Sequence, residues 1–259
     1  MFRAEEPPER LRAVVSAAET AGVTELWLWE DCFLEGGLTS AAAALAWSER
    51  LRIGVGLLPV PLRNPALAAM EIATLARLFP GRFLPTVGHG VSEWMGQVGG
   101  GVSSPMTLLA EYAGAVRELL HGRTVRAKGR YVQLENVALG WPPLEAPPLL
   151  IGGRGPRTIR CAGELADGVL LDSMVDVAGV RSARATIDEA RAAAGRPGRP
   201  KVVVFVEVDP HSPTQVREAV ETFGEAGADT VVLQGTHEHP EPEPIIAALT
   251  GPGGSHGLR

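Results

Sequence analysis

The stretch Pro148-Leu149-Leu150-Ile151-Gly152-Gly153-Arg154-Gly155-Pro156-Arg157-Thr158 joins an apolar run to a segment with helical spacing. The apolar run predicts a buried parallel strand, and Pro156 suits the first turn of a helix. An anion can bind here for three reasons: the first N–H groups of a helix are free, glycines allow close approach of the backbone, and Arg154 and Arg157 add positive charge. The stretch therefore predicts a strand–loop–helix unit that can hold a phosphate group, with a simple strand–helix connection as the alternative.

The same alternation of apolar runs and helical patterns continues on both sides of this stretch. Segments with helical spacing separate most of the apolar runs, and residues 124–139 predict a small hairpin between two of the units. Seven strands are predicted, at residues 24–29, 52–58, 82–87, 148–151, 168–172, 201–208 and 230–234. Repeated strand–helix units with continuous apolar strands predict a parallel sheet with helices outside it.

The fold class that fits this pattern is α/β, a TIM-like (β/α)8 barrel, which needs one strand more than is visible. The first strand is the missing one, because the chain starts almost at its first predicted helix. Residues 1–4 could supply a shortened strand, the barrel could be incomplete, or a partner could fill the gap. A doubly wound open sheet is the alternative, but Glu30-Asp31-Cys32 stands where a dinucleotide-binding fold has its glycines.

Composition and termini limit the class of protein. We expect one barrel domain over residues 1–236, followed by a short helix and a flexible tail over 237–259. A net charge of −6 without a long basic block argues against a nucleic-acid partner. Two cysteines and the histidines of the polar C-terminal segment predict no metal site. No run is long enough to span a membrane and no signal peptide is visible, so we expect a cytoplasmic protein.

Polar residues at the carboxyl ends of the predicted strands are the candidate catalytic groups, because barrel sites form there. Asp31 and Glu30 could form an acid–base pair, but neighbours on an extended chain point opposite ways, so we favour Asp31. His89 lies between Gly88 and Gly90 at another strand end, which indicates backbone close to a ligand. The alternatives are solvated loop acids and a structural histidine.

Several short segments follow one another in a specific order between about residue 7 and residue 172. They are AGVTELWL (21–28), ERLRIGVG (49–56), PLRNP (61–65), ATLAR (73–77), PGRF (80–83), VGHG (87–90), GRY (129–131), GGRGPR (152–157) and AGELADG (162–168). In this order and spacing the chain resembles the bacterial luciferase-like flavin and deazaflavin oxidoreductases, and most of all their coenzyme F420-type branch.

The resemblance implies a TIM-like barrel without a metal that binds FMN or a deazaflavin at its C-terminal face. It implies a cis non-proline peptide at Gly56-Leu57, behind the cofactor ring. Asp31 would lie near the reactive ring edge, and Gly88, His89 and Gly90 would line the other side of the ring. The cofactor phosphate would be held by Gly152, Gly153, Gly155, Arg157 and Thr158, with Arg154 beside them as the further candidate named above.

The resemblance also has departures and leaves alternatives. The first strand is missing, and the long insertion that relatives carry before the last strand is reduced here to residues 209–213. We expect an enzyme that transfers hydride between coenzyme F420 and a small organic substrate. We also expect a homodimer, formed through the helices at 39–48 and 64–79. The alternatives are an FMN-dependent monooxygenase that uses O₂, a non-catalytic degenerate flavin-binding barrel, and a phosphosugar-type barrel enzyme.

Overall fold

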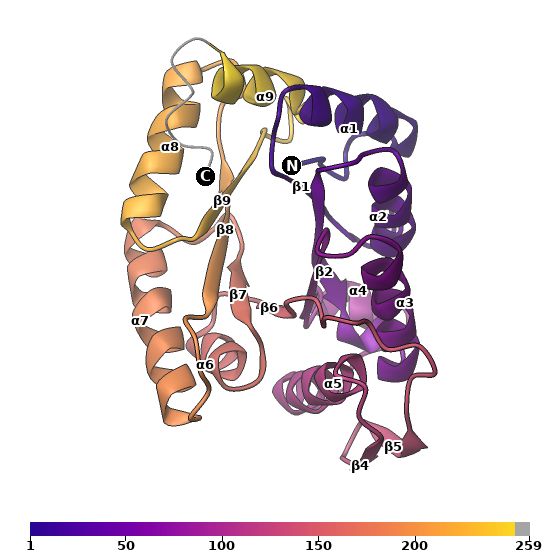
Figure 1. The fold of residues 1–259 in the computed structure, drawn as a ribbon. Coiled ribbons are helices and arrows are strands. Elements are labelled where there is room, and N and C mark those ends of the chain that lie inside the picture. Colours follow the sequence, from indigo (N-terminus) through magenta and orange to yellow (C-terminus); the bar gives the residue numbers. More distant parts are fainter. Residues whose placement is uncertain (252–259) are drawn as a thin grey trace.

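The computed structural model describes residues 1–251, which form a parallel sheet nearly closed into a barrel and surrounded by helices (Figure 1). The order of the strands in the sheet is their order in the sequence. The sheet contains β1 (Glu25–Leu28), β2 (Arg52–Pro59), β3 (Phe83–Gly88), β6 (Leu150–Gly152), β7 (Gly168–Leu171), β8 (Lys201–Glu207) and β9 (Thr230–Gln234). All seven predicted strands and the TIM-like fold are therefore confirmed.

The helices lie outside the sheet and connect its strands (Figure 1). They are η1 (Pro8–Arg10), α1 (Leu11–Thr20), α2 (Gly37–Ala46), η2 (Val60–Leu62), α3 (Pro65–Leu78), α4 (Ser92–Gln97), α5 (Pro105–Leu120), α6 (Pro156–Leu165), α7 (Val177–Ala193), α8 (Pro213–Glu225) and α9 (Glu243–Thr250). The predicted hairpin is present as the antiparallel pair β4 (Val125–Lys128) and β5 (Gln133–Val137). The predicted tail lies partly outside the described residues, which end at 251.

The N-terminal residues take the position of the missing first strand. Phe2 forms a parallel bridge with Leu28 of β1. On the other side, the amino group of Met1 donates a hydrogen bond to the carbonyl of Leu233 in β9, at 2.8 Å. Figure 1 shows this end of the chain between β1 and β9. Of the three alternatives for the first strand, the structure shows a very short pairing segment supplied by the N-terminus. This segment contacts both edge strands of the sheet, β1 and β9.

Two apolar layers form, because side chains alternate across each strand. One faces the helices, and the other fills the barrel interior with Met1, Trp27, Leu84, Leu150, Leu170, Val203, Phe205 and Val232. Gly54 leaves room for a large interior ring, since a Cβ atom there would lie 2.3 Å from the Trp27 side chain. The interior is thus a packed floor beneath the carboxyl ends of the strands. Among residues 1–251 no helix has both the length and the hydropathy to cross a bilayer.

Candidate functional site

Leu57 turns into the mouth of the barrel from the end of β2. The Gly56–Leu57 peptide is cis, as the resemblance implied, and the pairing of β2 with β3 shifts register between Val55 and Leu58. A Cβ atom on either Gly88 or Gly152 would lie 2.5 Å from Leu57 Cδ2. Only glycine at these two paired positions leaves space for the leucine side chain. The ends of β2, β3 and β6 thereby form one apolar surface in the mouth.

The loop between β6 and α6 lies beside this surface. Gly153 has a φ of 152°, and a Cβ atom there would lie 2.8 Å from Thr158 Cγ2. Thr158 is buried, and its hydroxyl Oγ1 lies 3.4 Å from His89 Nε2. Burial lowers the pKa of His89, so its imidazole is neutral at neutral pH. The structure therefore brings together His89 and the predicted phosphate loop, which the sequence places 63 or more residues apart.

The two arginines of this loop differ in their surroundings. The Arg154 guanidinium donates to Asp172 Oδ2 at 2.8 Å and lies 3.0 Å from Met174 Sδ, so it is bound to the loop after β7. Arg157 lies exposed in the first turn of α6, and Gly155 is the N-cap residue without a side-chain cap. Pro156 has no N–H, and the N–H groups of Thr158 and Ile159 both donate to the carbonyl of Gly155 at 3.0 Å. The N–H and the guanidinium of Arg157 are therefore the groups of this turn that can meet an anion from solvent.

Asp31 lies in the part of the mouth closed by the N-terminal segment. Burial, together with the nearby charge of Glu5, raises the pKa of Asp31 to about 6, and Arg3 acts against the shift. Arg3 is itself buried and donates to Glu5, to Glu207 Oε2 at 3.2 Å and to the carbonyl of Gly235 at 2.9 Å. An acid with its pKa near 6 can change protonation state in the neutral range, as a proton donor or acceptor requires.

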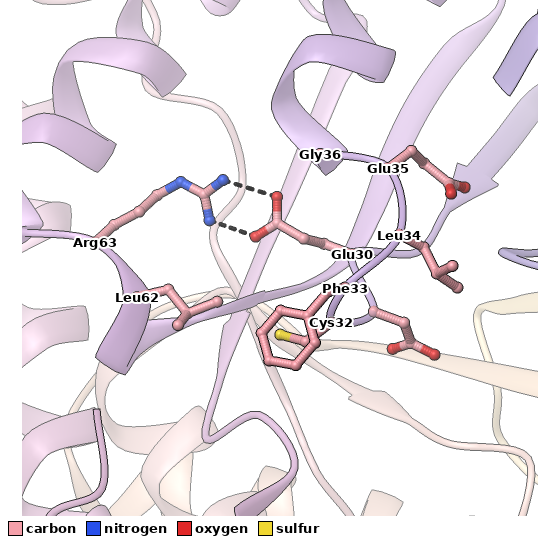
Figure 2. A pocket seen from close by; sticks show the side chains of 9 residues that line it. Glu30, Cys32, Phe33, Leu34, Glu35, Gly36, Leu62 and Arg63 are labelled. Carbon is pink, nitrogen blue, oxygen red and sulfur yellow. Dashed lines mark hydrogen bonds and ion pairs between the residues drawn. The ribbon is translucent and has the colours of Figure 1, made fainter. Parts of the chain in front are cut away.

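Glu30 faces the opposite way and has a structural partner. Its carboxylate accepts hydrogen bonds from both terminal nitrogens of Arg63 and, at 2.8 Å, from the N–H of Gly37 at the start of α2. Figure 2 shows the two side chains facing each other at the wall of a cavity of about 340 Å³. Asp31, Cys32 and the loop up to Gly36 line the same cavity. Because neighbouring side chains point opposite ways, Glu30 is held in a structural ion pair, whereas Asp31 can take part in chemistry.

Replacing Arg63 by alanine is expected to lower the free energy of unfolding by about 3 kcal/mol, because it leaves the buried Glu30 carboxylate without its cation. Urea unfolding at neutral pH measures the loss. The matched control is Arg126→Ala, which breaks the exposed pair with Glu135 and is expected to cost about 0.5 kcal/mol or less. Equal losses for both variants would show that the Glu30 pair is not structural.

Sequence reasoning missed three polar groups that point into the mouth. Trp29 packs against the interior layer, while Thr86 and Gln234 lie two residues after interior Leu84 and Val232, and therefore on the same face of β3 and β9. Within the described residues, Trp29 Nε1, Thr86 Oγ1 and Gln234 Oε1 are buried without a hydrogen-bond partner. Unpartnered buried polar atoms are costly in a protein that binds nothing there. Together with the surface of Leu57, these atoms fit a flat ring with polar edges, as in flavins and deazaflavins.

Comparison with known proteins agrees with this arrangement. Residues 2–226 match the family described as luciferase-like monooxygenase. A curated relative, a 5,10-methylenetetrahydromethanopterin reductase of Archaeoglobus fulgidus, is 28% identical over 164 residues, which cover 63% of this chain and 49% of the relative. The chain spans about half the length of the curated relatives it matches.

Two solved structures share the fold. An F420-dependent secondary alcohol dehydrogenase in complex with an F420-acetone adduct has a TM-score of 0.84 at 19% identity, covering 98% of both chains. The oxygenating constituent of a 3,6-diketocamphane monooxygenase of Pseudomonas putida, in complex with FMN, has a TM-score of 0.76 at 13% identity, covering 97% of this chain and 92% of the other. These likenesses show the TIM-like fold. The family match, which spans most of the sequence, shows more: the chain belongs to the luciferase-like monooxygenase family.

Proposed function

We propose that the protein is an oxidoreductase that binds coenzyme F420 in the mouth of the barrel and transfers hydride to or from a small organic substrate. The observation that carries the proposal is the meeting of three strand ends, where Leu57 covers Gly88 and Gly152 and His89 reaches Thr158. Membership of the luciferase-like family supports it, as do the relatives whose names specify F420.

Some residues of the mouth would bind the cofactor, and Asp31 would transfer a proton. The first turn of α6, with Arg157 and Thr158, would bind the cofactor phosphate. Leu57 would support one face of the ring, and the packed interior beneath it excludes water from the ring. Asp31 would hold or accept the proton that accompanies the hydride. A bound deazaflavin supplies the hydride-carrying carbon and does not activate O₂.

A second candidate is an FMN-dependent monooxygenase, because the FMN-bound neighbour shares the fold. Turnover experiments separate the two. With F420 and a series of small secondary alcohols, the proposal expects the F420 absorbance to fall equally in the presence and absence of O₂. Reduced FMN is expected to give no O₂ uptake above that of free reduced FMN. Enzyme-dependent O₂ uptake with FMN and no change of F420 absorbance would replace the proposal with the monooxygenase.

We also propose that the chain forms the homodimer expected from the sequence. Trp47, which follows α2, and Leu67 and Met70 of α3 are exposed large apolar side chains. Burial of such side chains against a second copy would stabilise a dimer. Light scattering on the purified protein is expected to give twice the mass of one chain, and the mass of a single chain would contradict the proposal.

A further inference from the structure

We propose that His211, His239 and Glu241 form a binding site for a divalent transition metal ion such as Zn²⁺, apart from the candidate cofactor site. The ligand atoms of these three side chains all lie within 4.8 Å of one another. Glu241 Oε1 is 3.7 Å from His211 Nε2 and 3.8 Å from His239 Nδ1. Two imidazoles and one carboxylate are a ligand set that zinc uses in proteins, with water in the fourth position.

The two distances from Glu241 to the histidines are close to those that a bound ion needs. Bonds of about 2.0–2.2 Å in a tetrahedral arrangement place neighbouring ligand atoms about 3.4 Å apart. The two distances to Glu241 exceed this value by only a few tenths of an ångström. Rotation of these partly exposed side chains can therefore complete the site without movement of the backbone.

The backbone N–H of each histidine donates a hydrogen bond to a nearby side chain. His211 lies in the loop between β8 and α8, where its N–H donates to Asp209 Oδ1 at 2.9 Å. The N–H of His239, after β9, donates to Thr236 Oγ1 at 3.1 Å. A Cβ atom on Gly235 would lie 2.1 Å from the carbonyl oxygen of His239, so this glycine permits the segment to fold back.

The topology explains why no sequence spacing reveals the cluster. β8 and β9 are neighbouring parallel strands, so the segments that follow them emerge side by side at one end of the sheet. His237 is nearer to His239 in sequence, but its Nδ1 lies 3.0 Å from Glu5 Oε1 instead. A cavity of about 410 Å³ borders His211 and gives solvent access for a water ligand. A bound ion would join the loop after β8 to the segment after β9.

The test is zinc binding to the full chain without a histidine tag, measured by competition with a chromophoric chelator at about pH 7.5. We expect one Zn²⁺ per chain in the wild type. His211→Ala, His239→Ala and Glu241→Gln are each expected to weaken binding at least about tenfold. The matched control, His237→Ala, removes a neighbouring exposed histidine and is expected to bind zinc as the wild type does.

The visible absorption of bound Co²⁺ provides a second, independent test of the same site. Co²⁺ in the wild type is expected to give the visible absorption of a tetrahedral complex with nitrogen and oxygen ligands, and His239→Ala is expected to lose it. Circular dichroism of the metal-free variants checks that each is folded, as their exposed positions lead us to expect. Failure of the wild type to bind zinc, unchanged binding in both histidine variants, or an equal loss in His237→Ala would overturn the proposal.

Discussion

Replacing Gly153 by alanine is expected to weaken F420 binding at least about tenfold. Gly153 has a φ of 152°, which is unfavourable for other residues by about 1–3 kcal/mol. The new methyl group would also lie 2.8 Å from Thr158 Cγ2. Both effects displace the first turn of α6, where the cofactor phosphate is proposed to bind. Fluorescence titration with F420 measures the affinity, and urea unfolding measures the stability.

Gly155 provides a matched control two residues away in the same loop. Its φ is −75°, and an added Cβ atom would have Thr158 Oγ1 at 4.0 Å as its nearest neighbour. Gly155→Ala keeps the backbone N–H that can bind an anion, so we expect near-normal affinity and stability. If the two variants bind F420 equally well, the loop geometry does not hold the cofactor.

Replacing Asp31 by asparagine is expected to lower kcat about 10²–10⁴-fold, because the side chain can then neither take up nor release a proton. In the wild type the pKa of Asp31 is about 6, raised by burial. Oxidation of a substrate requires the carboxylate, so its rate is expected to rise as the pH increases through about 6. Reduction requires the acid, and its rate is expected to fall over the same interval. Rates measured in both directions against pH test this.

The control for Asp31 is Glu93→Gln, which removes an exposed carboxylate of α4 and is expected to leave both pH profiles unchanged.

The pH dependence of the free energy of unfolding tests the same pKa independently. Because the folded-state pKa of Asp31 is raised from 3.8, its contribution to stability is present at low pH and is lost as the pH rises through about 6. Asp31→Asn is therefore expected to be more stable than the wild type at pH 7. An inflection near pH 6 that persists in Asp31→Asn would assign it to another group.

The sequence predicts elements well where each residue contributes to a local pattern. The helix expected to start at Pro156 does start there in the structure, because proline suits its first turn. Closure of the barrel by Phe2 is only one of three alternatives in the sequence, because a segment that pairs through one isolated bridge has no periodicity to detect. Four-residue strands such as β1 were visible because continuous apolar runs mark them.

The candidate site could be predicted only in part, for a similar reason. Strand ends identify Asp31, His89 and the phosphate loop, because barrel topology alone places them on one face. The partners of these groups depend on contacts across the sheet. Arg3 reaches Asp31 only because the N-terminal segment lies between β1 and β9, and the burial of Gln234 depends on the same closure. The hydrogen bond that holds Arg3 there joins it to Gly235, 232 positions away, and no local pattern records such a contact.

Binding of a deazaflavin in the barrel mouth can be measured by equilibrium titration of the purified wild-type protein with F420. Fluorescence of the cofactor follows binding, with FMN titrated in parallel. We expect saturable binding of one F420 per chain with a Kd well below about 1 mM, and weaker binding of FMN. We also expect inorganic phosphate to compete with F420. No saturable F420 binding up to about 1 mM, or tighter binding of FMN, would contradict the proposed function.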